Sequence, residues 1–94
     1  MKAQRLLSER HQLTADAFVE IKVWQVPQPV RGSSHDLKYA LAYVVAGACV
    51  LRYDNEAGKG DHRHIGGVET TYSFTTPQKL MADFWNDVDQ WRPE

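Results

Sequence analysis

The sequence has a single cysteine, Cys49, so no disulfide can form within the chain. It also lacks a long hydrophobic run: the longest, residues 40–51, is interrupted by Gly47 and is far shorter than the roughly 20 residues of a membrane-spanning helix. Residues 1–10 contain only two leucines, too few for a signal peptide. We therefore expect a protein of a reducing, cytoplasmic compartment that does not contact a membrane.

Charge of one sign is not in excess either. Eleven lysines and arginines stand against 12 aspartates and glutamates, giving a formal net charge of −1. This excludes a protein that coats nucleic acid through bulk positive charge, but it leaves room for a small basic site. Hydrophobic residues at 43% and charged residues at 24% exclude a disordered chain. The 94 residues allow one small domain, which we expect to span residues 1–94.

Several segments have the alternating polarity that is typical of half-buried strands. Residues 17–26 alternate and are followed by Pro27, which has no N–H for a sheet. Residues 37–54 predict an antiparallel hairpin that turns at Ala46 and Gly47, and residues 69–74 predict a short strand. Residues 6–13 fit either an edge strand or a short helix.

The C-terminal segment predicts a helix. Thr76 is a suitable N-cap, and Pro77 fits the first helical position. Apolar residues recur at helical spacing and form a stripe that we expect to pack on the sheet, while Asp83, Asp87 and Gln90 fall on the solvent side. The expected fold is α+β: an antiparallel meander of four to five strands with a C-terminal amphipathic helix packed on one face. The stripe consists of Leu80, Met81, Phe84, Trp85, Val88 and Trp91.

Residues 52–67 differ from the rest of the chain because they gather glycines, mixed charges and two histidines. If residues 61–64 are extended, His62 and His64 project to one side, and Asp61 and Arg63 to the other. Arg52 and Asp54 on the adjoining strand would be within reach of the two imidazoles. A pair of imidazoles can divide the roles of base and acid near neutral pH.

These residues fit the cleavage of a phosphodiester. One histidine would take the proton of a ribose 2′-hydroxyl, and the other would protonate the leaving oxygen. Cationic groups would hold the phosphate. We assign the catalytic roles to His62, His64, Asp54 and Arg52, and substrate binding to Lys59, Arg63 and Tyr53. This hypothesis requires no metal or other cofactor.

Two alternatives stay open for the same segment. His62 and His64 with a nearby aspartate, Asp54 or Asp61, have the donor types of a small metalloprotein. The segment also fits a charged, solvated loop whose histidines hydrogen-bond to the backbone. Elsewhere, Cys49 between apolar residues is typical of an inert buried thiol, and His35 of a surface or hydrogen-bonded residue.

The sequence also resembles a known family. The resemblance rests on the strand around Tyr39, on Arg52-Tyr53-Asp54-Asn55, on Asp61-His62-Arg63-His64, and on the helix with Asp83-Phe84-Trp85. Together they resemble the TumE family of small toxins from bacterial and archaeal toxin–antitoxin modules, over nearly the whole chain. The matching positions Arg52, Asp54, His62 and His64 are thereby candidates for the site.

The resemblance implies a small cytoplasmic toxin encoded beside an antitoxin, typically one with a helix-turn-helix DNA-binding domain. By analogy, size and architecture are also similar to those of RelE-type ribonuclease toxins. The hypothesis is thus a toxin that acts on RNA or another phosphodiester, with a non-enzymatic protein-binding module as the alternative. Exposed sheet edges predict either a homodimer or an antitoxin complex.

Overall fold

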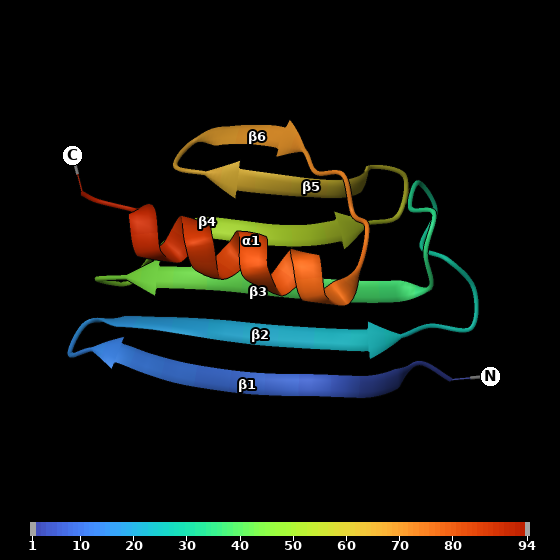
Figure 1. The fold of residues 1–94 in the computed structure, drawn as a ribbon, viewed down its shortest axis with the longest axis horizontal. Helices are drawn as coiled ribbons and strands as arrows, with labels where there is room; N and C mark the ends of the chain where they lie inside the picture. Colours follow the sequence, from blue (N-terminus) through green and yellow to red (C-terminus); the bar gives the residue numbers. More distant parts are fainter. Residues whose placement is uncertain (1, 94) are drawn as a thin grey trace.

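The computed structural model describes residues 2–93. These residues form one antiparallel sheet of six strands in the order β1-β2-β3-β4-β5-β6, with the helix α1 laid across one face (Figure 1). Each strand pairs with its neighbours in the chain, so the topology is a simple meander. The elements are β1 (Gln4–Thr14), β2 (Ala17–Gln25), β3 (Leu37–Val45), β4 (Ala48–Glu56), β5 (Gly60–Ile65), β6 (Val68–Thr71) and α1 (Pro77–Gln90).

The α+β class is confirmed, but the expected strand count of four to five is too low. Residues 6–13, which fitted a strand or a helix, lie in β1. Their side chains are exposed on both sides apart from Leu7, which is why the hydrophobic period is weak there. The strand expected over residues 69–74 is shorter and ends at Thr71.

The hairpin predicted over residues 37–54 is present as β3 and β4. Ala46 and Gly47 both have positive φ, at 50° and 80°, as a tight two-residue hairpin turn of the primed type requires. Alternation also governs burial in β2, where Val19, Ile21 and Val23 are buried and the residues between them are half-buried.

The helix begins as its sequence predicts, but it ends before the last residue of the expected apolar stripe. The Thr76 hydroxyl accepts a hydrogen bond from the Lys79 N–H at 3.1 Å, and Pro77 opens the first turn. Trp91 caps the C-terminus rather than lying within the helix, and its N–H donates to the Asp87 carbonyl. It packs edge-on against Tyr43 of β3.

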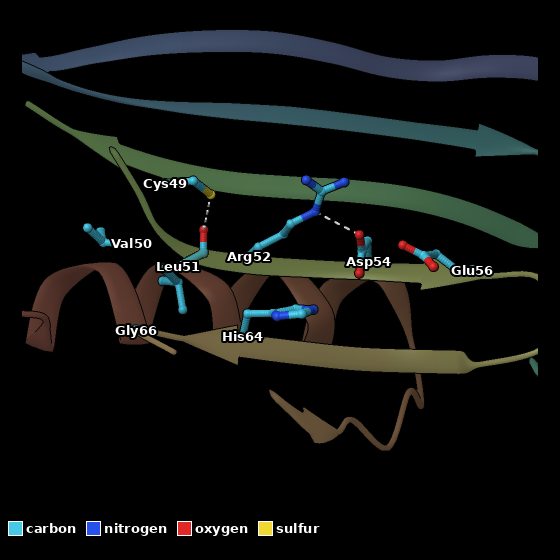
Figure 2. Close-up of a pocket in the computed structure, with 8 residues that line it drawn as sticks. All are labelled: Cys49, Val50, Leu51, Arg52, Asp54, Glu56, His64 and Gly66. Carbon is cyan, nitrogen blue, oxygen red and sulfur yellow. Dashed lines mark hydrogen bonds and ion pairs between the residues drawn. The ribbon is translucent and has the colours of Figure 1, made fainter. Parts of the chain in front are cut away.

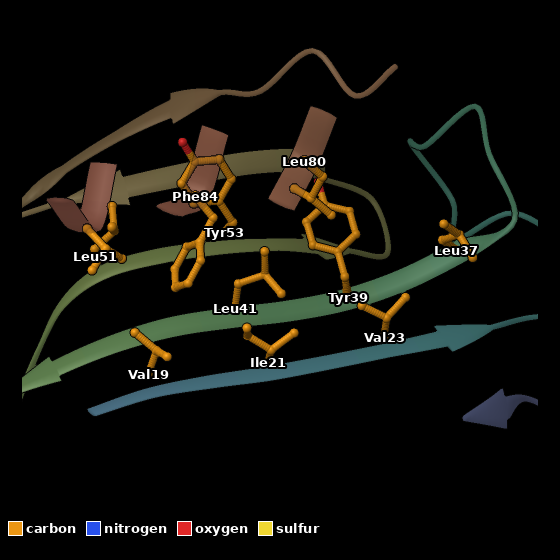
Figure 3. Packing of buried hydrophobic residues seen from close by; sticks show 11 residues of the cluster. Val19, Ile21, Val23, Leu37, Tyr39, Leu41, Leu51, Tyr53, Leu80 and Phe84 are labelled. Carbon is orange, nitrogen blue, oxygen red and sulfur yellow. The ribbon is translucent and has the colours of Figure 1, made fainter. Parts of the chain in front are cut away.

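One core lies between the helix and the sheet (Figure 3). Leu80, Phe84 and Val88 of α1 contact alternate residues of β2, β3 and β4. Phe84 is fully buried and meets Tyr53 edge-on, so its burial stabilises the fold by about 2–3 kcal/mol. Within residues 2–93 no helix covers the opposite face of the sheet, and we call that face the open face (Figure 1).

Two expectations about the helix surface are wrong. Asp87 is turned toward the sheet, where it accepts a hydrogen bond from the Tyr53 hydroxyl. Asp83 accepts from the Tyr72 hydroxyl at 2.6 Å and from Lys79. Hydrogen bonds from Lys79 first, and then from Tyr72, lower the pKa of the Asp83 carboxyl. The Asp87 carboxylate thus contacts β4, and the Asp83 carboxylate contacts the loop that follows β6, instead of both pointing into bulk water.

Cys49 is exposed, which corrects the expectation of a buried thiol. The cause is a register shift in the β3–β4 ladder, where Tyr43 pairs with Leu51 but Val44 pairs with Cys49. The bulge interrupts the alternation that runs from Leu51 to Tyr53, so Cys49 does not reach the core. No helix in residues 2–93 has the length and apolar character needed to cross a membrane.

Candidate functional site

The two histidines of the His-x-His sequence share the open face, as the period of two predicts. Across the β4–β5 ladder, Asp54 pairs with His62 and Arg52 pairs with His64. The imidazole centroids of His62 and His64 are 5.1 Å apart, with their planes at 67°. The strand pairing therefore brings together all four predicted catalytic residues, which we call the open-face cluster: Arg52, Asp54, His62 and His64.

Asp54 is the buried centre of this cluster. Only 6% of its side chain is exposed, and Arg52 Nε donates a hydrogen bond to its Oδ2 at 2.7 Å. Half of the Arg52 side chain remains exposed, so the rest of the guanidinium is free to meet a ligand. An ion pair that holds the carboxylate also fixes the direction of the guanidinium.

His62 is as buried as Asp54, with 5% of its side chain exposed. Its Nδ1 lies 3.1 Å from the Gly60 carbonyl oxygen, and its Nε2 lies 2.7 Å from Asp54 Oδ1. Although that distance is short, Asp54 Oδ1 accepts no hydrogen bond from any residue in the described range. The two atoms are therefore close together without the alignment that a hydrogen bond requires.

Glu69 of β6 completes the surroundings of the histidines. Its Oε1 lies 3.7 Å from His62 Nε2, 3.9 Å from His64 Nε2 and 3.6 Å from Lys59 Nζ. From the sequence, Glu69 was expected at the start of a strand but not in the site. The register of the β5–β6 hairpin, which turns at Gly66 and Gly67 and pairs Glu69 with His64, is the signal that locates it.

Two hollows border the cluster. Figure 2 shows the first, of about 350 Å³, with Arg52, Asp54 and His64 side by side on the open face and α1 behind the sheet. The second, of about 360 Å³, is lined by Lys59, His62, Glu69, Thr70 and Thr71. His64 thus opens on the first hollow, and His62 on the second.

Two of the residues assigned to substrate binding lie on the helix side of the sheet. Tyr53 is fully buried against Phe84, and its hydroxyl donates to Asp87. Arg63 NH1 lies 3.3 Å from the same carboxylate. Burial raises the pKa of the Tyr53 phenol to about 12, and hydrogen bonding to Tyr53 raises the pKa of Arg63. Lys59, in contrast, lies on the open-face side beside Glu69.

Asp61 organises a separate, partly buried set of polar residues at the end of the core. It accepts hydrogen bonds from the Tyr39 hydroxyl at 2.7 Å, from His35 Nε2 at 2.7 Å and from Ser33. His35 Nδ1 accepts from the Leu37 N–H, which assigns the ring proton to Nε2. We call Asp61, Ser33, His35 and Tyr39 the Asp61 network.

The Asp61 network is not arranged for nucleophilic catalysis. Ser33 donates to Asp61 instead of to His35, so the hydroxyl lacks the contact with an imidazole base that a serine nucleophile of the Ser–His type uses. The His35 ring stacks on Phe74, with centroids 3.8 Å apart. His35 is thus a hydrogen-bonded residue, which is one of the two roles expected from the sequence. The hydrogen bonds of the Asp61 network connect the β2–β3 loop to the sheet.

The open-face cluster also has the donors for a metal ion. Asp54, His62 and His64 each offer one ligand atom, and these atoms lie within 4.8 Å of one another. Two imidazoles and a carboxylate suit first-row transition metals. The cluster can therefore act through proton transfer or through a bound cation.

Comparison with family models matches residues 2–92 to Toxin TumE. Neither the curated proteins nor the solved structures gave a match to the chain. The matched range spans all six strands and the helix, and it includes the whole open-face cluster. The chain therefore belongs to the TumE toxin family.

Proposed function

We propose that the protein is the toxin of a prokaryotic toxin–antitoxin pair, acts in the cytoplasm, and cleaves phosphodiester bonds of RNA at the open-face cluster. One observation carries the proposal of cleavage. Two imidazoles with centroids 5.1 Å apart border hollows that also receive an exposed guanidinium, Arg52, and an exposed ammonium, Lys59. Cationic groups beside a pair of proton carriers match the needs of a phosphodiester in its transition state.

The two imidazoles have different surroundings, which suggests how they divide the work. His64 is more exposed, at 36% of its side chain, and takes the proton of a ribose 2′-hydroxyl as that oxygen attacks phosphorus. His62 acts as the acid, with the Gly60 carbonyl oxygen 3.1 Å from its Nδ1 and Asp54 Oδ1 2.7 Å from its Nε2. It gives its proton to the 5′-oxygen as the P–O5′ bond breaks, leaving a 2′,3′-cyclic phosphate.

Arg52 and Lys59 bind the phosphate in this proposal. A guanidinium can donate two parallel hydrogen bonds to phosphate oxygens, and an ammonium adds a point charge. Asp54 orients Arg52 through a hydrogen bond from Nε and lies 2.7 Å from His62 Nε2, so one buried carboxylate adjoins both groups. The sequence also assigned Arg63 and Tyr53 to the substrate; this assignment requires the substrate to reach the helix side of the sheet.

The antitoxin partner follows from the family and from the sheet. The outer strands β1 and β6 each leave one edge without a paired strand within residues 2–93. Unpaired N–H and C=O groups on an 11-residue strand such as β1 can bind an extended segment of another chain. An antitoxin with a helix-turn-helix domain, or a second copy of this chain, would cover such an edge.

The test is expression of the protein without its antitoxin. We expect growth arrest, RNA fragments with 2′,3′-cyclic phosphate ends from the purified protein, and loss of both effects in a His62→Ala/His64→Ala double variant. His11→Ala is the matched control, because His11 is an exposed histidine of β1. Circular dichroism and thermal unfolding establish that each variant is folded.

Two outcomes would contradict the proposal. Growth arrest by a folded double variant would remove the open-face cluster from the mechanism. A wild-type protein that leaves growth and RNA unchanged, yet co-purifies tightly with a partner, would instead identify a non-enzymatic protein-binding module.

A further inference from the structure

Three metal-ligating side chains of the open-face cluster converge on one point. Asp54 and His62 are buried, His64 is half-buried, and their ligand atoms lie within 4.8 Å of one another. We propose that Asp54, His62 and His64 bind one divalent transition-metal cation of the zinc type. Cation binding by these residues does not depend on the proposed cleavage of RNA.

The lack of a hydrogen bond at the buried Asp54 Oδ1 is the observation that points to a ligand. A buried carboxylate oxygen normally accepts hydrogen bonds, but this one accepts none from the described residues, although His62 Nε2 is 2.7 Å away. A hydrogen bond needs the N–H to point at the oxygen. Two ligands of one cation instead both point at the cation, so a close contact that is out of line fits a shared ion.

Neighbouring groups leave the correct atoms available. The Gly60 carbonyl lies 3.1 Å from His62 Nδ1 and can accept its proton, which keeps Nε2 as the ligand atom. Arg52 donates to Asp54 Oδ2, which keeps Oδ1 for the cation. Outer contacts of this kind, on the second nitrogen of a histidine and the second oxygen of a carboxylate, are the usual support of metal ligands.

A further carboxylate stands beside the three ligands. Glu69 Oε1 lies 3.7 Å from His62 Nε2 and 3.9 Å from His64 Nε2, so a small side-chain movement makes it a fourth ligand. Two negative carboxylates then attract the cation. The positive charges of Arg52 and Lys59 oppose its binding, but water screens them because about half of each side chain is exposed. Imidazole nitrogens favour Zn²⁺ over Mg²⁺ or Ca²⁺.

Cation binding has a consequence for the proposed cleavage. A metal ion and a proton compete for the same nitrogen lone pairs, so a filled site removes His62 and His64 as proton carriers. Zn²⁺ would therefore inhibit RNA cleavage by the metal-free protein. This consequence rests on the proposed function, whereas the binding site itself does not.

The experiment is a calorimetric titration of Zn²⁺ into the protein, prepared without a histidine tag and freed of metal. We expect one Zn²⁺ per chain and no heat from Mg²⁺. His64→Gln and Asp54→Asn should each weaken Zn²⁺ binding by at least about tenfold, which is the lower end of the effect of disturbing even an outer contact of a metal ligand. His11→Gln, away from the site, should bind as the wild type does. Co²⁺ in place of Zn²⁺ should give the strong visible absorption of a four-coordinate site, and Glu69→Gln should change that spectrum.

Each result has one meaning. Equal Zn²⁺ affinity in the wild type and in folded His64→Gln and Asp54→Asn variants would overturn the site, as would the absence of binding. RNA cleavage that persists without Zn²⁺ binding would overturn the metal site but retain the proposed function. Site-dependent Zn²⁺ binding that leaves cleavage unchanged, or stimulates it, would support the metal site and overturn the proton transfer by His62 and His64.

Discussion

Asp61 and His62 are adjacent in β5 but serve opposite faces of the sheet. Asp61 accepts hydrogen bonds from Tyr39 and His35 on the core side, whereas His62 lies against Asp54 on the open side. Alternation along a strand produces this division. It separates the Asp61 network from the open-face cluster, at which we propose that ligand binds, and the two can be tested independently.

Removal of the Asp61 carboxylate should destabilise the protein without changing the open-face cluster. Asp61→Ala leaves the buried Tyr39 hydroxyl and the half-buried donors of Ser33 and His35 unpaired, so we expect the free energy of unfolding in urea to fall by about 2–4 kcal/mol. Asp61→Asn should recover part of this loss, because an amide oxygen still accepts from Tyr39. Asp89→Ala, an exposed carboxylate of α1, is the control. Equal stability of the Asp61→Ala and Asp89→Ala variants would show that the Asp61 network is not structural.

Gly60 and Gly66 form a matched pair for a backbone test, since both have positive φ, at 75° and 60°. A Cβ at Gly60 would lie 2.5 Å from the Gly32 carbonyl oxygen, but a Cβ at Gly66 meets nothing within 4 Å. Gly66→Ala should thus cost about 1–2 kcal/mol of backbone strain. Gly60→Ala should cost about 3 kcal/mol or more, because the loop around Gly32 must also move. Urea unfolding of both variants measures the difference, and equal losses would mean that this backbone contact is unimportant.

Substitution of Arg52 tests the cationic part of the proposed site. Arg52→Gln removes the exposed guanidinium, and we expect KM for an RNA oligonucleotide to rise about tenfold or more, because a charge-assisted hydrogen bond contributes about 1.5–3 kcal/mol. Arg63→Gln is the comparison on the helix side, where the lost contact with Asp87 should lower stability and leave KM unchanged. A rise in KM for Arg63→Gln as large as that for Arg52→Gln would place Arg63 in substrate binding, as the sequence predicted.

The open-face cluster could be anticipated from sequence because it depends on local geometry. Residues two apart in a strand share a face, which brings His62 next to His64, and a hairpin of residues 48–65 brings Arg52 and Asp54 beside them. Glu69 was missed because its place depends on the register of the next hairpin. The alternating pattern does not set that register when β6 is short and its side chains are all exposed.

The errors in the fold have a similar cause. β1 is an edge strand with little buried surface, so its sequence carries no clear period. Cys49 directly precedes a bulge, which alternation cannot foresee. Asp87 was placed toward solvent because helical periodicity gives its angle around α1 but not the distance from α1 to Tyr53 and Arg63. To avoid each of these errors one would have to know how elements pack in three dimensions, and the spacing of residues along the chain does not provide that.

The buried tyrosines predict alkaline unfolding. Burial first, and hydrogen bonds to carboxylates second, raise the phenol pKa of Tyr39 and Tyr72, and burial raises that of Tyr53 from 10.0 to about 12. A raised phenol pKa means that folding favours the neutral form. The resulting stabilisation is complete below the unfolded value of 10.0 and is lost as the pH rises toward 12.

Tyr53→Phe isolates the contribution of one phenol. For Tyr53 the raised pKa corresponds to about 2–3 kcal/mol below pH 10, and Tyr53→Phe should flatten the fall of the unfolding free energy between pH 10 and 12. Tyr43→Phe, at a half-buried position, is the control. Urea unfolding at several pH values, with ultraviolet absorbance to follow phenolate formation, measures both quantities. If a folded protein ionises all four of its tyrosines near pH 10, the buried contact between Tyr53 and Asp87 does not hold the helix to the sheet in the way the structure indicates.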